Sequence, residues 1–147
     1  MQKRLIKTLL ILIQALLIGM QFLPVGVAAS STPGSKEPLS VFGMIHRYAG
    51  MGFSNDALVY LLLSCLLPIV TVFMLIFVGE RYNFGTAACL SAFYMLAAAC
   101  FFTAAKRKMV DSVAMTGLHY LIILVSLLSF ALAAWGFCIC APSSKET

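Results

Sequence analysis

Four long runs without a charged side chain constrain this chain more than any other feature. They cover residues 8–29, 58–79, 85–105 and 117–140. About 20 apolar residues in a helix cross the hydrocarbon core of a bilayer, and each run reaches that length. The composition agrees, because 62% of the residues are apolar and only 10% are charged, whereas a soluble domain carries about 25% charged residues. The sequence predicts an all-α integral membrane protein, a four-helix transmembrane bundle with up-down connectivity.

The first run has two interpretations. Basic residues at Lys3 and Arg4, an apolar stretch, Pro24 and a small residue at Ala29 are the pattern of a cleavable signal peptide, and cleavage there would leave three helices. Alternatively, residues 1–29 stay as a signal anchor and first transmembrane helix. We favour retention, because more spans follow and an uncleaved anchor serves the same purpose. Two glutamines of this run share one helix face and need partners in neighbouring helices, which also favours retention.

The remaining boundaries follow from the charged and polar breaks between the runs. We expect an extracytoplasmic loop with a short interfacial helix, a second transmembrane helix, a cytoplasmic turn, a third transmembrane helix, an extracytoplasmic basic loop, a fourth transmembrane helix and a cytoplasmic tail. In the same order, these segments are residues 30–57, 58–79, 80–84, 85–105, 106–116, 117–140 and 141–147.

Charge gives only weak information about orientation. Lys3, Arg4 and Lys7 precede the first run and place the N-terminus in the cytoplasm, which puts the C-terminus there as well. With this topology the basic residues divide five against five between the two sides, so the first segment decides. The outer cluster of Lys106, Arg107 and Lys108 is interpreted as a set of interface anchors at the headgroups. The sequence has no N-x-S/T acceptor, which fits a bacterial cell (inner) membrane.

Small side chains recur at helical spacing in the third and fourth runs. Alternating spacings of three and four keep such residues on one helix face, where they let another helix approach closely. We therefore interpret them as helix-packing residues rather than a pore lining. They are Ser126, Ser129, Ala133 and Gly136 in the fourth run, and Ala87, Ser91 and Ala98 in the third.

No motif in the sequence names a reaction. The four runs contain no Asp, Glu, Lys or Arg, whereas ion-coupled carriers place such a group at membrane depth. His46 and His119 lack metal-ligand spacing, and the five cysteines lie in or at the ends of the apolar runs, where packing is their expected role. We expect no enzymatic activity, no cofactor and no metal. The basic residues flank apolar runs, so we expect no nucleic-acid partner.

Two functional hypotheses remain. The first is a small non-enzymatic protein that acts by helix packing within the lipid bilayer, as an accessory, assembly or regulatory partner of another membrane protein, or as a homo-oligomer. The alternative is an oligomeric transporter or channel subunit without an intramembrane charged residue. Such a subunit would use a bend at Pro68 together with polar groups such as Gln14, Gln21, Thr71 and Tyr94.

Overall fold

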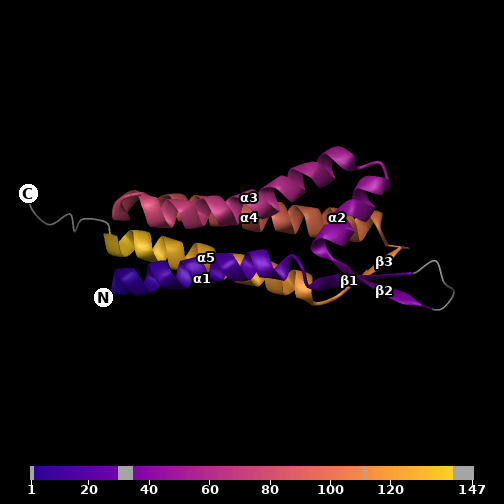
Figure 1. Ribbon diagram of the computed structural model, residues 1–147, viewed down its shortest axis with the longest axis horizontal. Helices are drawn as coiled ribbons and strands as arrows, with labels where there is room; N and C mark the ends of the chain where they lie inside the picture. Colours follow the sequence, from indigo (N-terminus) through magenta and orange to yellow (C-terminus); the bar gives the residue numbers. More distant parts are fainter. Residues whose placement is uncertain (1, 30–34, 111, 141–147) are drawn as a thin grey trace, which may run out of the picture.

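The computed structural model describes residues 2–29, 35–110 and 112–140. The described chain is mostly helical and contains one small sheet (Figure 1). Three of its helices, α3, α4 and α5, are long and apolar enough to cross a membrane. The elements, in chain order, are α1 (Gln2–Met20), β1 (Pro24–Ala29), β2 (Lys36–Ser40), α2 (Val41–Gly50), α3 (Ser54–Phe77), α4 (Glu80–Lys108), β3 (Val113–Met115) and α5 (Leu118–Cys140).

The first apolar run is not one helix, contrary to the expectation for residues 8–29. α1 ends at Met20, the backbone turns, and β1 begins at Pro24. Proline lacks the N–H that a helix interior needs, and β-branched residues such as Val25 and Val27 favour a strand. Three basic residues also occupy the first two turns of α1, so the uncharged part of this helix is shorter than that of the other long helices.

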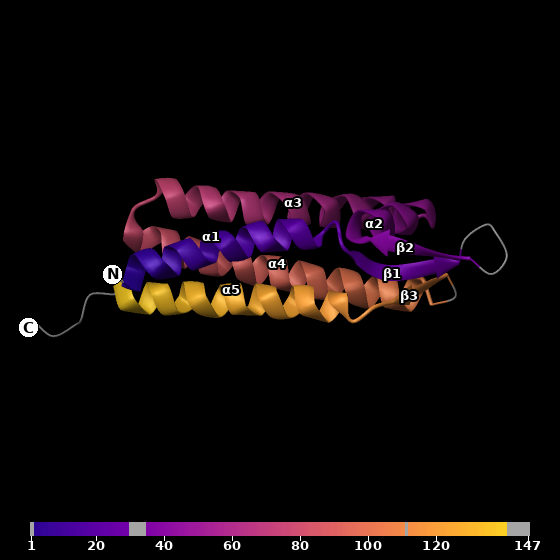
Figure 2. The ribbon, with the colours of Figure 1, turned by 60° about the horizontal axis from the view of Figure 1, so that its bottom comes forward.

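The four long helices lie side by side (Figure 2). α1 packs against α3 and α5, and α4 packs against the same two helices. Buried positions recur along α4 at alternating spacings of three and four, which is the repeat of left-handed helix packing. These positions are Phe84, Ala87, Ser91, Tyr94, Ala98, Phe101 and Ala105. α1 begins and α5 ends at the same end of the molecule (Figure 1).

A three-stranded antiparallel sheet, which the sequence did not predict, lies at the other end. Its strand order is β2-β1-β3, with β1 in the centre. Val27 is the partner of Pro38 on one side and of Ala114 on the other. Beyond the paired residues, the amide of Thr116 donates to the carbonyl of Val25 at 2.9 Å. We call the sheet together with α2 the head.

The short helix expected in the loop at residues 30–57 is present as α2. Ser40 caps it, because its side chain accepts a hydrogen bond from the amide of Gly43 at 3.2 Å. The buried face of α2 includes Val41, Met44 and Tyr48. α2 is thus amphipathic, and its apolar face turns toward the rest of the protein.

The head and the adjacent helix ends share one hydrophobic core. Leu17 of α1, Val25 of β1 and Met44 of α2 belong to the same buried cluster as the last turns of α4. Close packing at Gly26 makes this possible, since a Cβ there would lie 2.9 Å from Val113 and 3.0 Å from Met44. A larger side chain at this glycine would clash with Val113 of β3 and would force the end of the Met44 side chain to move.

Several helix boundaries also differ from the expected ones. The predicted turn at residues 80–84 lies inside α4, and only Val78 and Gly79 separate α3 from α4. α3 begins four residues early, with Asp56 in its first turn, where a carboxylate favours the positive end of the helix dipole. The predicted loop at 106–116 contains the end of α4 and the strand β3. α5 agrees with the prediction to one residue, and the expected tail at 141–147 lies outside the described residues.

Candidate functional site

A buried polar network joins three helices near their middle. The side-chain amide of Gln14 in α1 donates to Ser129 Oγ of α5 at 2.7 Å and lies 3.4 Å from Ser91 Oγ of α4. The two serine oxygens are 2.9 Å apart and share a hydrogen bond. Each of the three side chains is almost fully buried. Such bonds between helices stabilise a membrane bundle by about 0.6 to 2 kcal/mol each.

A second set of buried polar groups lies closer to the head. The amide nitrogen of Gln21 donates to Tyr94 OH at 2.5 Å and to the carbonyl of Leu17 at 3.3 Å. The hydroxyl of Thr71 donates to the carbonyl of Leu67 in its own helix at 2.7 Å. Together with Gln14, these are the groups that a transport pathway would use. The donors of Gln14, Gln21 and Thr71 are instead bonded within the protein. Oε1 of Gln21 is buried and has no partner among the described residues.

The predicted helix-packing residues are all buried, and two of them, Ser91 of α4 and Ser129 of α5, are hydrogen-bonded to each other. A Cβ at Gly136 would lie 2.6 Å from the ring of Phe84, and a Cβ at Gly85 would lie 3.3 Å from Phe137. The seam between α4 and α5 therefore depends on these small residues. In α5 the residues are Ser126, Ser129, Ala133 and Gly136, and in α4 they are Ala87, Ser91 and Ala98.

An aromatic cluster connects the head to α3 and α4. Tyr60 of α3 stacks on Phe101 of α4 with ring centroids 4.0 Å apart, and Tyr48 of α2 meets the same phenylalanine edge-on at 5.5 Å. Phe53 stacks on Tyr48 at 5.0 Å. Each aromatic pair contributes about 0.5 to 1.5 kcal/mol beyond the burial of its surface. This cluster fixes the position of α2 relative to the two helices.

A cavity of about 330 Å³, which we call the junction cavity, lies beside this cluster. The hydroxyls of Tyr48 and Tyr60 are buried and have no hydrogen-bond partner among the described residues. Sequence reasoning missed the cavity, because its lining comes from three elements and depends on how they pack. The lining residues are Tyr48, Asp56, Val59, Tyr60, Leu63, Ala97, Cys100, Phe101 and Ala104.

Opposite charges stand at the mouth of the junction cavity. Lys108 Nζ lies 3.9 Å from Asp56 Oδ2 and 3.5 Å from the centre of the Phe53 ring. Both charged side chains are exposed, so the ion pair itself contributes little to stability. The neighbouring Lys106 and Arg107 are exposed as well. The structure thus places the predicted interface anchors next to the head, and their binding to headgroups stays a prediction.

The histidines and cysteines form no metal site in the part of the chain that the structure describes. His46 is exposed on α2, whereas His119 is buried and its Nδ1 pairs with the carbonyl of Thr116. No group of three or more His, Cys, Asp or Glu side chains within residues 2–29, 35–110 and 112–140 is placed to hold an ion. The five cysteines are free thiols.

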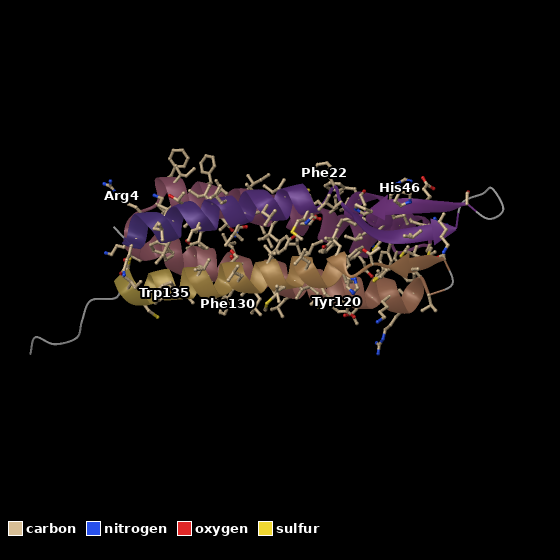
Figure 3. All side chains as sticks on the ribbon, turned by 90° about the horizontal axis from the view of Figure 1, so that it is seen from below. Arg4, Phe22, His46, Tyr120, Phe130 and Trp135 are labelled. Carbon is tan, nitrogen blue, oxygen red and sulfur yellow. The ribbon has the colours of Figure 1, made fainter. Side chains whose placement is uncertain are left out.

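Exposed aromatic side chains mark both ends of α5. Tyr120 lies at the end near the head, and Trp135 lies toward the opposite end, where Arg4 of α1 is also found (Figure 3). Both rings are more than half exposed. They are fifteen residues apart, about 22 Å along a helix axis. Tyrosine and tryptophan at these two levels are typical of the two interfaces of a membrane.

Comparisons with known proteins identify no relative of this chain. No family model, no curated protein and no solved structure matches it.

Proposed function

We propose that the chain is a non-enzymatic membrane protein that holds its head at one surface of the bilayer as an accessory, assembly or regulatory partner of another membrane protein. The observation that carries this proposal is the single core shared by the head and the helix ends. A surface fixed in this way to membrane helices keeps one position relative to the bilayer, which is what docking onto a neighbouring membrane protein requires.

In this proposal α1 is a fourth transmembrane helix. It contains 19 residues, about 28 Å of helix, against a hydrocarbon core of about 30 Å. Lys3, Arg4 and Lys7 at its start extend toward the headgroups. Gln14 supports this placement, because its amide nitrogen lies within hydrogen-bond distance of side chains of α4 and α5.

Retention of the N-terminal segment is part of the same proposal. Cleavage after Ala29 would remove α1 and the central strand of the sheet. The strands β2 and β3 would lose their only partner within the described sheet, and Val113 and Met44 would lose the close contact at Gly26. We therefore propose a bacterial inner-membrane protein with four spans, with both ends of the chain in the cytoplasm and the head outside.

The outer faces of the helices support docking through the head. α3 and α5 expose large aliphatic and aromatic side chains such as Leu66, Phe73 and Leu124, which suit lipid tails. The small and polar residues of α4 and α5 are buried in contacts within the chain, so they are not available to a partner. The head, by contrast, exposes side chains other than the aliphatic and aromatic ones that suit lipid tails. They are His46 in α2 and Met51 directly after it.

Affinity purification in mild detergent tests the proposal. The full chain, tagged at its C-terminus, is expected to recover another membrane protein at a fixed ratio. A His46→Glu and Met51→Glu double variant should lose that partner at least tenfold, because it changes the exposed surface of the head. Leu124→Phe changes only an exposed position of α5 and is the matched control. Recovery of the wild-type chain alone and monomeric, or an unchanged complex with the double variant, would contradict the proposal.

The transporter alternative receives no comparable support. Each of its proposed polar side chains takes part in a hydrogen bond inside the protein, and of their buried polar atoms Oε1 of Gln21 has no partner within the described residues. Liposomes that contain the purified chain should therefore show no flux of ions or small cations above that of empty liposomes. A saturable flux that disappears in Gln14→Leu would favour transport instead.

A further inference from the structure

We propose that the junction cavity binds one zwitterionic phospholipid from the leaflet on the side of the head. The inference rests on the part of the proposed function that places α3 and α4 in the bilayer. It does not depend on which side of the membrane the head occupies. It requires no partner protein.

The shape of the cavity suits a lipid chain. On α4 its wall contains Ala97, Cys100 and Ala104, spaced three and four apart, so small side chains form a lane over about two helical turns. Val59 and Cys100 in the wall are exposed, so the cavity opens on the outer surface of the helices. An acyl chain can enter such a lane sideways from the surrounding lipid.

The bend of α3 widens this lane. Pro68 lies inside α3, and the first half of the helix leans away from α4 (Figure 1). Proline removes one backbone hydrogen bond and crowds the carbonyl four residues earlier, which bends a helix. The bend separates the two walls of the cavity near the head, where the bulkier part of a lipid would lie.

Two tyrosines of the lining have hydroxyls without a hydrogen-bond partner among the described residues. Tyr48 is 1% exposed and Tyr60 is 4% exposed, and neither hydroxyl has a partner within the described residues. A buried hydroxyl without a partner costs about 1 to 3 kcal/mol. Phospholipids carry ester carbonyl and phosphate oxygens at the depth where the head meets the helices. Because both hydroxyls are themselves buried, a lipid oxygen would bind them only after a small shift of the Tyr48 or Tyr60 ring.

The charges at the mouth select the headgroup. Asp56 lines the cavity and Lys108 lies 3.9 Å from it, so one anion and one cation stand side by side. A zwitterionic headgroup matches both, since its phosphate pairs with the ammonium of Lys108 and its own ammonium pairs with the carboxylate of Asp56. An anionic lipid satisfies only the lysine, and a sterol satisfies neither charge.

Native mass spectrometry of the purified full-length chain tests the assignment. The protein is reconstituted in nanodiscs with equal amounts of phosphatidylethanolamine and phosphatidylglycerol, then released into mild detergent. We expect one phosphatidylethanolamine to stay bound per chain, at least fivefold more often than phosphatidylglycerol. No retained lipid, or a preference for phosphatidylglycerol, would overturn the proposal. The same holds for preferential retention of a sterol when one is added.

Two pairs of variants separate the cavity from the rest of the surface. Ala104→Phe fills the lane and should reduce bound phosphatidylethanolamine at least tenfold, whereas Thr103→Phe adds the same ring one residue away, outside the lining, and should not. Asp56→Asn should abolish the preference between the two lipids, whereas Glu37→Gln on β2 should preserve it. Equal effects within either pair would overturn the proposal.

Loss of lipid could also arise because α4 is misfolded or lies outside the bilayer. A spin label on Cys100, in a chain whose other cysteines are replaced, distinguishes this case from an empty cavity. A label on Cys89 is the control, because this exposed cysteine lies on the same face of α4, nearer the other end. Relaxation of both labels by lipid-soluble oxygen shows that α4 is in the bilayer. Ala104→Phe should change the mobility of the label on Cys100 and leave the label on Cys89 unchanged. Labels that do not sense oxygen would contradict the membrane placement itself, and an unchanged Cys100 label would contradict the cavity.

Discussion

Gly136 is a point of very close contact between α4 and α5. A Cβ at this position would lie 2.6 Å from the ring of Phe84, a rigid side chain that cannot move aside without shifting its helix. We expect Gly136→Ala to lower the free energy of unfolding by about 1 to 3 kcal/mol, as overpacking does. Thermal unfolding in detergent measures the change.

A second glycine offers the control. Gly19 in α1 has no atom within 4 Å of a Cβ, so Gly19→Ala should leave stability unchanged or raise it by up to about 1 kcal/mol. Adding Phe84→Leu to Gly136→Ala should restore part of the loss. If the two glycine variants behave alike, the close contact between the two helices is not as described.

Gln14 tests whether the buried polar network stabilises the helices. Gln14→Leu keeps the volume of the side chain but removes its hydrogen bond to Ser129, while Ser91 and Ser129 can still pair with each other. We expect a loss of about 0.6 to 2 kcal/mol. In a double-mutant cycle with Ser129→Ala, the two losses should not add. Additive losses would show that the bond does not exist in the membrane.

At the level of elements, the decisive feature is the pairing of β1 with β3. Ala28 and Val113 are opposite each other and both buried, whereas Ala114 is exposed on the other face. In a chain without its native cysteines, Ala28→Cys with Val113→Cys should therefore form a disulfide on mild oxidation. Ala28→Cys with Ala114→Cys should not. Mass spectrometry after thiol alkylation counts the free thiols, and equal reactivity in the two pairs would contradict the register.

The sequence predicted the long helices better than it predicted the head. α3, α4 and α5 are uninterrupted apolar runs, so their presence was evident and is confirmed, although polar residues such as Glu80 and Lys108 extend α4 beyond its apolar part. The strands gave no such signal. β1 continues an apolar run, and the three residues of β3 are too few to show an alternating pattern.

In the candidate site, too, some features were predictable from the sequence and others were not. Heptad spacing identified small residues of α4 and α5 that the structure buries, because one helix face is defined by local sequence alone. The junction cavity depends on α2, α3 and α4 together, and on where Pro68 bends α3. No local pattern contains that arrangement. The ion pair between Lys108 and Asp56 was not predictable from local sequence either, because the two residues are 52 positions apart in the chain.

On the scale of the whole molecule, α1 and β1 are the elements on which the proposed membrane arrangement depends most. α1 contributes Gln14 to the network between helices, and β1 is the central strand of the head. Without them the chain would be a three-helix protein with no sheet of the described kind. The proposed four-span arrangement, the core shared by the head and the helix ends, and the hydrogen bonds of Gln14 all require that residues 2–29 remain part of the mature protein.

The intact mass of the protein purified from its native membrane tests this requirement directly. We predict a mass that includes residues 2–29, rather than that of a chain cut after Ala29. Terminal sequencing of the same sample should find no chain that begins at Ser30. A mature protein that begins at Ser30 would contradict the proposal, because α1 and the central strand β1 would then be absent from it.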